Sequence, residues 1–267
     1  MNRARIKQTY KIFKDVLRSF YQRYQWKHLV IHRRTLTKLP AAFILPLTSR
    51  HVKGKLKCPS EITIVLIHNY PYAPITEKSL QYVGINNYVV LKPEVRGEWR
   101  NALKLLEFKK YLDSGECQSK YILYLDSDDV VIRDSPEKAI QYLEQQDCDL
   151  LFSCTPYNGG YECMPQALKW TDQLSAEAGF GKLYINSGVF FGKTETVKEL
   201  LDASVEYVTE NDLTRAEYYK HLNEQTMCKS LSEFPKEVGC DQIIIRHLHP
   251  EFYPRMKLDF KEQLALR

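Results

Sequence analysis

The sequence YILYLDSDD, residues 121–129, joins five apolar or aromatic residues to a cluster of three aspartates. An apolar run of this length is typical of a strand buried on both faces of a parallel sheet. Asp126, Asp128 and Asp129 follow where that strand ends, and open α/β sheets bind ligands at the carboxyl ends of their strands. Clustered carboxylates raise one another's pKa unless a cation neutralises them. The stretch therefore predicts a site for Mn²⁺ or Mg²⁺.

Strands and helices are predicted to alternate on both sides of this stretch. Apolar runs predict the strands, and periodicity near 3.6 residues with capping signals predicts the helices. The predicted strands are 62–67, 88–91, 121–125, 149–154 and 255–258, and the predicted helices are 98–112, 135–146, 165–178 and 195–209. Residues 183–192 are predicted to form a strand broken by a glycine turn. This order predicts an α/β fold with a mostly parallel central sheet.

Charge is distributed unevenly along the 267 residues. Residues 1–57 carry a net charge of +14, whereas the remaining residues carry −9. A hydrophobic content of 44% excludes a largely disordered chain. The predicted organisation is a basic N-terminal arm, residues 1–57, followed by one α/β domain, residues 58–267.

The arm is predicted to contain an amphipathic helix over residues 3–28. One stripe of that helix is apolar and the rest is rich in Lys and Arg; the stripe consists of Ile6, Tyr10, Phe13, Leu17, Phe20 and Tyr24. Such a helix suits an anionic membrane surface, or the stripe packs on the domain or on a partner helix. Nucleic acid is not an expected partner, since no nucleic-acid-binding fold accompanies the charge.

The sequence predicts a cytoplasmic protein, peripheral to the inner face of a membrane if the arm binds lipid. No secretory signal is visible, and the most apolar segment, 39–47, is far shorter than the roughly 20 residues of a spanning helix. The seven cysteines form no C-x-x-C pair, which favours reduced thiols.

The aspartate cluster has two other interpretations. It can be a solvated acidic loop, or the D-x-D-x-V strand end of a haloacid-dehalogenase-type phosphatase with Asp126 as nucleophile. Such phosphatases usually begin with that strand and need an acidic pair after a later strand. Here two strands are predicted to precede it, and no convincing acidic pair follows.

The order of motifs over residues 60–267 resembles the glycosyltransferase domain of procollagen lysyl hydroxylases and their bacterial relatives. That domain has a GT-A fold, a Rossmann-like fold that binds nucleotide-diphospho-sugars. The segments that carry the resemblance are 96–100 with Lys104, 124–130, 150–153, 184–192, 241–242 and 256–259. The resemblance implies a metal-dependent hexosyltransferase that uses a UDP-sugar donor. Its acceptor stays open and is a glycan, a lipid-linked sugar or a protein.

The resemblance and the residue chemistry together predict a site in three parts. Metal ligands are expected among Asp126, Asp128, Asp129 and His249. The nucleotide and its diphosphate are expected at His68, Asn69, Tyr70, Arg100, Lys104 and Ser127. The donor sugar is expected at Asn186, Ser187, Gly188 and Gln242, whose amides and hydroxyl exchange hydrogen bonds with sugar hydroxyls. Asp241 either accepts a proton from the acceptor hydroxyl or binds the donor sugar.

Two positions depart from the family pattern. Asp128 replaces a tyrosine, so either Asp128 or Asp129 is a candidate second acid at the metal. Phe260 replaces the family's histidine ligand, which leaves His249, His247, Asp259 or water as the third ligand. A protein without that ligand can also be a catalytically silent binding protein attached to a membrane by its basic helix.

Overall fold

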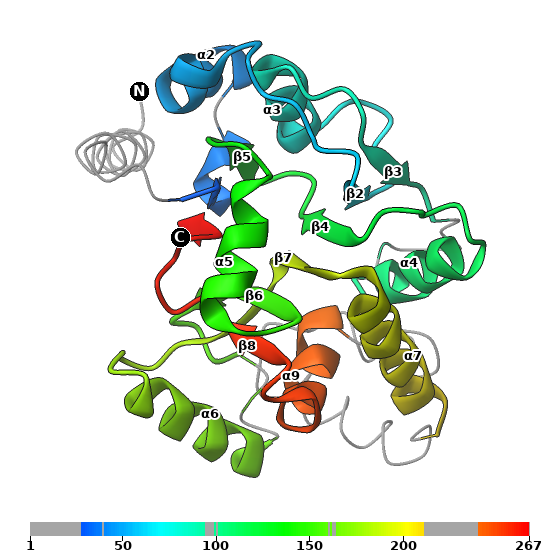
Figure 1. Cartoon of the computed structure of the whole chain (residues 1–267), viewed down its shortest axis with the longest axis vertical. Helices are drawn as coiled ribbons and strands as arrows, with labels where there is room; N and C mark the ends of the chain where they lie inside the picture. The colour runs from blue at the N-terminus through cyan, green and yellow to red at the C-terminus, as the bar shows by residue number, and fades with distance from the viewer. Residues whose placement is uncertain are drawn as a thin grey trace, which may run out of the picture.

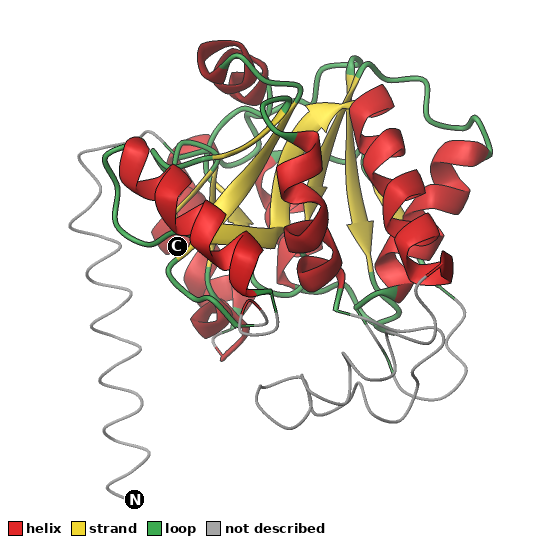
Figure 2. Ribbon diagram, turned by 90° about the horizontal axis from the view of Figure 1, so that it is seen from below, coloured by secondary structure: helices red, strands yellow, loops and turns green. Residues whose placement is uncertain are grey.

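The structure, a computed structural model, describes residues 28–38, 40–93, 99, 101–159, 161, 164–210 and 240–266. Its centre is a six-stranded sheet of order β3-β2-β4-β7-β6-β8 with helices on both faces (Figures 1 and 2). The strands are β2 (Ile62–Ile67), β3 (Val89–Leu91), β4 (Tyr121–Leu125), β6 (Leu150–Thr155), β7 (Tyr184–Lys193) and β8 (Met256–Leu258). Of these six, only β7 runs against the others. The predicted α/β fold class with a mostly parallel central sheet is therefore confirmed.

Apolar side chains from both faces of this sheet form two packed layers. One layer contains α4 (Leu103–Asp113), α7 (Thr194–Glu210) and α9 (Asp241–Phe252). The other contains α3 (Ile75–Val83) and α5 (Lys138–Gln146). The remaining described helices are α2 (Ala41–Ser49), α6 (Pro165–Glu177) and two 3₁₀ helices, η2 (Arg34–Lys38) and η3 (Arg50–Val52). None of the described helices is long and apolar enough to span a membrane.

A second, smaller sheet joins segments that are far apart in the sequence. It consists of β5 (Val130–Ile132), β1 (Val30–His32) and β9 (Ala265–Leu266), in that order. β1 is antiparallel to β5 and parallel to β9, and Figure 1 shows these strands beside the end of the chain. Leu29, Val30 and Ile31 are buried in the cores of the domain.

This small sheet corrects the predicted domain boundary. Residues 28–57 were expected to belong to a separate basic arm, but β1 and α2 pack into the domain. The physical reason is that β1 and α2 contribute apolar side chains to the same core as β5 and β9. The amphipathic helix predicted over residues 3–28 lies outside the described residues, except for His28.

Local structure agrees with the prediction over most of the domain and differs at three of the predicted elements. The helix predicted from residue 98 begins at Leu103. α5 begins at Lys138 rather than Ser135, because hydrogen bonds from Lys138 N to Ser135 O and from Ala139 N to Pro136 O form a preceding turn. The glycine turn predicted within 183–192 is wrong, since β7 is continuous through Gly188. Its pairing with β6 instead shifts register, from Phe152 opposite Phe190 to Ser153 opposite Asn186.

Candidate active site

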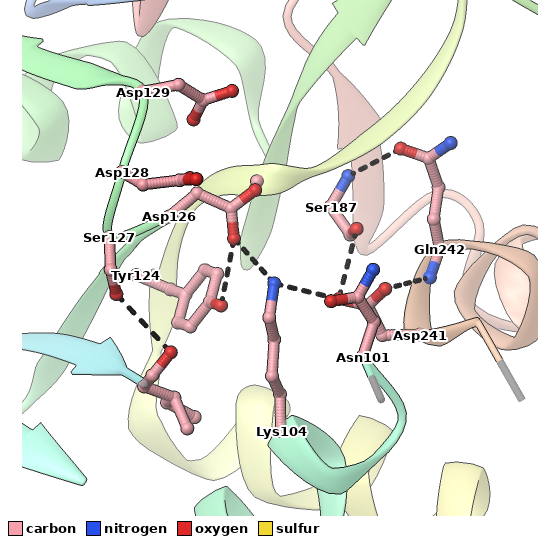
Figure 3. Close-up of polar contacts among 12 residues, drawn as sticks. Asn101, Lys104, Tyr124, Asp126, Ser127, Asp128, Asp129, Ser187, Asp241 and Gln242 are labelled. Atoms are coloured by element: carbon pink, nitrogen blue, oxygen red, sulfur yellow. Dashed lines mark hydrogen bonds and ion pairs between the residues drawn. The ribbon is translucent and has the colours of Figure 1, made fainter. Parts of the chain in front are cut away.

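The three aspartates lie at the carboxyl end of β4, in the middle of the large sheet (Figure 3). Hydrogen bonds on both sides fix the main chain of Asp126. Its N–H donates to the carbonyl of Gly188 at 2.7 Å, and its carbonyl accepts the hydroxyl of Thr76 at 2.7 Å. The strand end is therefore held between β7 and α3, and the first carboxylate has a defined position.

Two of the aspartates converge with a histidine from β1. The carboxylate of Asp129 lies 2.9 Å from His32 Nε2, and that of Asp126 lies 3.9 Å from the same nitrogen. One ligand atom from each of the three residues lies within 4.8 Å of the others, and no other such His, Cys, Asp and Glu group occurs in the described part of the chain. Two carboxylates and one imidazole are a donor set that holds a divalent cation in proteins. The centre is thus a possible metal site.

Gly188 leaves room for this centre. A Cβ atom at this position would lie 2.5 Å from Asp126 Oδ2 and would overlap the imidazole of His32. Because such contacts are shorter than any van der Waals separation, a larger residue would displace the histidine or the carboxylate. The glycine predicted to approach a sugar therefore lies against the possible metal ligands.

Lys104 on α4 connects the aspartate cluster to α9. Its ammonium lies 2.7 Å from Asp126 Oδ1 and 3.8 Å from Asp241 Oδ2. Figure 3 marks both contacts with dashed lines. Burial favours the neutral amine, but the two carboxylates outweigh it and raise the pKa of Lys104 well above its ordinary value. Burial also disfavours the ionised form of Asp126, yet Lys104 and His32 lower its pKa to about 2. Lys104 and Asp126 are therefore both charged at neutral pH.

Three of the residues predicted to bind the nucleotide follow β2, near Asp128. The phenol of Tyr70 donates to Asp128 at 3.3 Å, and its ring stacks on Tyr72 at 5.5 Å. Buried His68 contacts Glu77 at 2.9 Å, and exposed Asn69 follows it. Burial, reinforced by Asp129 and Asp126, raises the pKa of Asp128. Asp128 thus faces the aromatic pair, while Asp129 faces the histidine.

The residues predicted to bind the sugar form one hydrogen-bonded network between β7 and α9. Gln242 accepts the amide of Asn186 at 3.0 Å and the main-chain N–H of Ser187 at 3.3 Å. The hydroxyl of Ser187 donates to Asp241 at 3.3 Å. Burial raises the pKa of Asp241, although Lys104 opposes that effect. The structure therefore brings these residues together beside Lys104.

Several predicted residues are used elsewhere or lie outside the described residues. His249, predicted to bind metal, is fully buried with its ring 4.8 Å from Trp170, and it is not part of the three-residue group. The hydroxyl of Ser127 donates to the carbonyl of Ile67 at 3.3 Å, although it was predicted to face the nucleotide. Arg100 lies outside the described residues.

The other two substitutes for the family's histidine ligand are also engaged in structural contacts. His247 lies against Tyr207 with 4.4 Å between ring centroids, and buried Asp259 accepts the main-chain N–H of Gln263 at 3.0 Å. Phe260, at the family's ligand position, stacks on Phe180. His247, Asp259 and Phe260 therefore make packing and main-chain contacts rather than contacts with the aspartate cluster.

Sequence reasoning missed His32. This residue ends a short apolar run, Leu29-Val30-Ile31, and the three-residue strand β1 gives no periodicity. His32 and Asp126 are far apart in the sequence and meet only through the pairing of β1 with β5. No local pattern predicts so distant a pairing. The signal that remains is a histidine directly after a buried apolar run, which alone is weak.

Comparisons with known proteins add a distant likeness in fold. No protein-family model matches the sequence, and no curated protein matches it significantly. Among solved structures, one similar chain is a glycosyltransferase involved in the glycosylation of the major capsid of PBCV-1. The two chains are 17% identical and have a TM-score of 0.38, and the match covers 74% of this chain and 81% of that chain. Another is A197 from STIV, with 13% identity and a TM-score of 0.32 over 53% of this chain and 67% of that chain. At these values neither likeness assigns a role to any residue.

Proposed function

We propose that this chain is a metal-dependent glycosyltransferase that uses a UDP-sugar donor, as its resemblance to the lysyl hydroxylase glycosyltransferase domain implies. The observation that carries the proposal is the convergence of Asp126, Asp129 and His32 at the carboxyl end of β4. Lys104 and the network around Asp241 lie directly beside that group. Carboxylates, a largely buried ammonium and amide and hydroxyl groups suited to sugars thus lie together at the carboxyl end of β4.

The diphosphate would be held next to Asp126 and Asp129. The buried Asp129 Oδ1 has no hydrogen-bond partner in the described structure, and Gly188 keeps the space around Asp126 open, so the residues fit a bound Mn²⁺ or Mg²⁺. Such an ion offsets the charge that develops on a leaving diphosphate. Lys104 adds a fixed positive charge 2.7 Å from Asp126 and orients that carboxylate.

The sugar would lie toward α9. Asn186, Ser187 and Gln242 present amide and hydroxyl groups that can exchange their mutual hydrogen bonds for bonds to sugar hydroxyls. Asp241 either accepts the proton of the acceptor hydroxyl or binds the donor sugar. Burial raises its pKa, which increases its basicity as a carboxylate.

The base would lie at the aromatic pair beside Asp128. Tyr70 is held by its hydrogen bond to Asp128, and Tyr72 stacks on it while 62% of Tyr72 stays exposed. A fixed aromatic face beside the diphosphate position suits a uracil ring. The acceptor would be a glycan, a lipid-linked sugar or a protein, and a cytoplasmic location at an anionic membrane surface would depend on residues 3–28.

A panel of UDP-sugars, with and without Mn²⁺, tests the proposal. A transferase without its acceptor hydrolyses one donor slowly, and only when the metal is present. A haloacid-dehalogenase-type phosphatase would instead prefer phosphate monoesters. A catalytically silent binding protein would hydrolyse neither, and that result would refute the proposal.

Substituting the first aspartate tests the assignment of the site. Asp126→Asn should lower metal-dependent donor turnover by at least about a hundredfold, because the neutral amide is a poor ligand and a poor partner for Lys104. Asp147→Asn is the matched control: Asp147 ends α5 in the left-handed region, which asparagine tolerates. Turnover assays and circular dichroism of both variants would show whether activity changes without loss of the fold. Equal turnover in the two variants would contradict the assignment.

A further inference from the structure

We infer that His32, supplied by β1, is the third protein ligand of the metal site and makes that site selective for Mn²⁺ over Mg²⁺. The inference rests on the proposed function only in assuming that Asp126 and Asp129 hold a divalent ion. It concerns a residue outside the segment that resembles the glycosyltransferase family.

The topology delivers His32 to the aspartates. In the antiparallel pairing of β1 with β5, His32 lies opposite Val130, the residue directly after Asp129. The main-chain N–H of Arg33 also donates to the carbonyl of Asp129 at 2.9 Å. The strand that carries the histidine is therefore bonded to the segment that carries the second acid.

The contact between His32 and Asp129 is close without being a hydrogen bond. The two side chains approach to 2.9 Å at His32 Nε2 and Asp129 Oδ1. Yet Asp129 Oδ1 is buried and has no hydrogen-bond partner among the described residues. The side chain of His32 is only 1% exposed. His32 Nε2 and Asp129 Oδ1 are therefore placed so that both can bind the same metal ion.

Space around the imidazole is reserved by Gly188. Any Cβ atom there would overlap His32 Cε1 and lie 2.9 Å from Nε2. The same Cβ would lie 2.5 Å from Asp126 Oδ2, so a single missing side chain leaves both groups free to converge. This clearance is at the face where Asp126 and His32 meet.

The donor set decides between the two candidate ions. Mg²⁺ takes oxygen ligands almost exclusively. Mn²⁺ also suits carboxylate oxygen, but as a first-row transition metal it accepts an imidazole nitrogen more readily than Mg²⁺ does. Carboxylates accept either kind of ion. One nitrogen with two carboxylates therefore favours Mn²⁺, and replacing the nitrogen by an amide oxygen should reduce that preference.

Metal binding to the full chain, stripped with chelator and titrated with Mn²⁺ or Mg²⁺ alone, tests the inference. Calorimetry of His32→Gln should show Mn²⁺ affinity reduced by at least about tenfold, with a smaller change for Mg²⁺. His51→Gln is the matched control, because His51 is exposed on η3 and its ring contacts the carbonyl of Arg133 at 2.9 Å rather than an aspartate of the cluster. Unfolding curves of both variants would show whether the fold persists.

Pulsed electron paramagnetic resonance of bound Mn²⁺ gives a direct reading of nitrogen ligation. The wild-type chain should show coupling to a histidine nitrogen that shifts on ¹⁵N-histidine labelling and disappears in His32→Gln but not in His51→Gln or His249→Gln. Coupling retained in His32→Gln, or absent in the wild type, would overturn the inference. Nitrogen coupling that depends on His32 in a chain that hydrolyses no UDP-sugar would refute the proposed function and leave the ligand assignment intact.

Discussion

Lys104 is a largely buried cation, its side chain 12% exposed, shared between two acids that come from different elements. Its ammonium contacts Asp126 after β4 and Asp241 at the start of α9. Removing one member of a buried ion pair leaves an uncompensated charge, which costs about 3–5 kcal/mol. The residue therefore contributes to stability as well as to the charge that would face a diphosphate.

Lys104→Met should lower the free energy of unfolding by about 3 kcal/mol and weaken UDP binding by more than about tenfold. Chemical denaturation and calorimetry with UDP in the presence of Mn²⁺ measure the two effects. Lys110→Met, on the exposed side of the same helix, should change stability by less than about 0.5 kcal/mol. If the Lys104 variant bound UDP as tightly as the wild type, Lys104 would have no role at the diphosphate.

A substitution at Gly188 tests how closely His32 and Asp126 approach each other. Gly188→Ala should abolish Mn²⁺ binding and cost about 1–3 kcal/mol of stability, because the added methyl group overlaps His32 and Asp126. Gly181→Ala is a suitable control, since its Cβ would meet no atom within 4 Å. Calorimetry and thermal unfolding of both variants provide the comparison. Normal Mn²⁺ affinity in Gly188→Ala would show that the cluster is wider than its geometry indicates.

At the scale of elements, α9 packs on α6 through a buried histidine. The ring of His249 lies edge-on to Trp170, and burial lowers the pKa of His249 to about 3. In the unfolded chain a histidine has a pKa near 6.5. Between these values the unfolded state binds the additional proton, so the free energy of unfolding falls as the pH falls through this window.

His249→Leu should remove this dependence. Between pH 6.5 and pH 4 the wild type should lose up to about 1.4 kcal/mol per pH unit relative to the variant, whereas above pH 7 their difference should be constant. Urea unfolding at several pH values measures that difference, and other titrating groups cancel because both proteins contain them. Curves that stay parallel down to pH 4 would contradict the burial of a neutral imidazole.

The strands show which parts of the fold the sequence predicts and which parts it does not. β2 and β4 are long apolar runs, and their observed bounds agree with the prediction. Strands β1, β5 and β9 have three, three and two residues, which is too short for any periodicity, and they are stabilised by pairing across the chain. For that reason the aspartates could be predicted from local pattern, whereas His32 could not. His249 was a reasonable substitute in sequence, but tertiary packing places it against Trp170.

At the scale of the whole molecule, β1 and α2 place the start of the domain before the predicted boundary, so the +14 of residues 1–57 is divided between residues 1–27 and residues 28–57, with +7 each. Residues 1–27 contain eight Lys and Arg residues and one Asp, a net charge of +7. Each basic residue near an anionic membrane contributes about 1 kcal/mol of binding. A test of membrane binding should therefore remove residues 2–27 and keep β1.

We expect the full chain to sediment with vesicles that contain phosphatidylserine, and the shortened chain to stay in solution. Binding should weaken as salt rises from about 0.05 to about 0.5 M, by the general screening of surface charge. Neutral phosphatidylcholine vesicles serve as the control, and Mn²⁺ affinity of the shortened chain confirms that the domain is intact. Equal sedimentation of both chains would refute a role of residues 1–27 at membranes.

The ammonium of Lys104 neutralises Asp126 from within the fold itself. Under the proposed function, the position of Asp126 can therefore be fixed during synthesis even in a cell that is short of manganese. Under the proposed function, such a cell would accumulate a correctly folded but idle reserve of the protein. Import of the trace element would then switch on this reserve with no new translation, and a chelator would return it to the idle form.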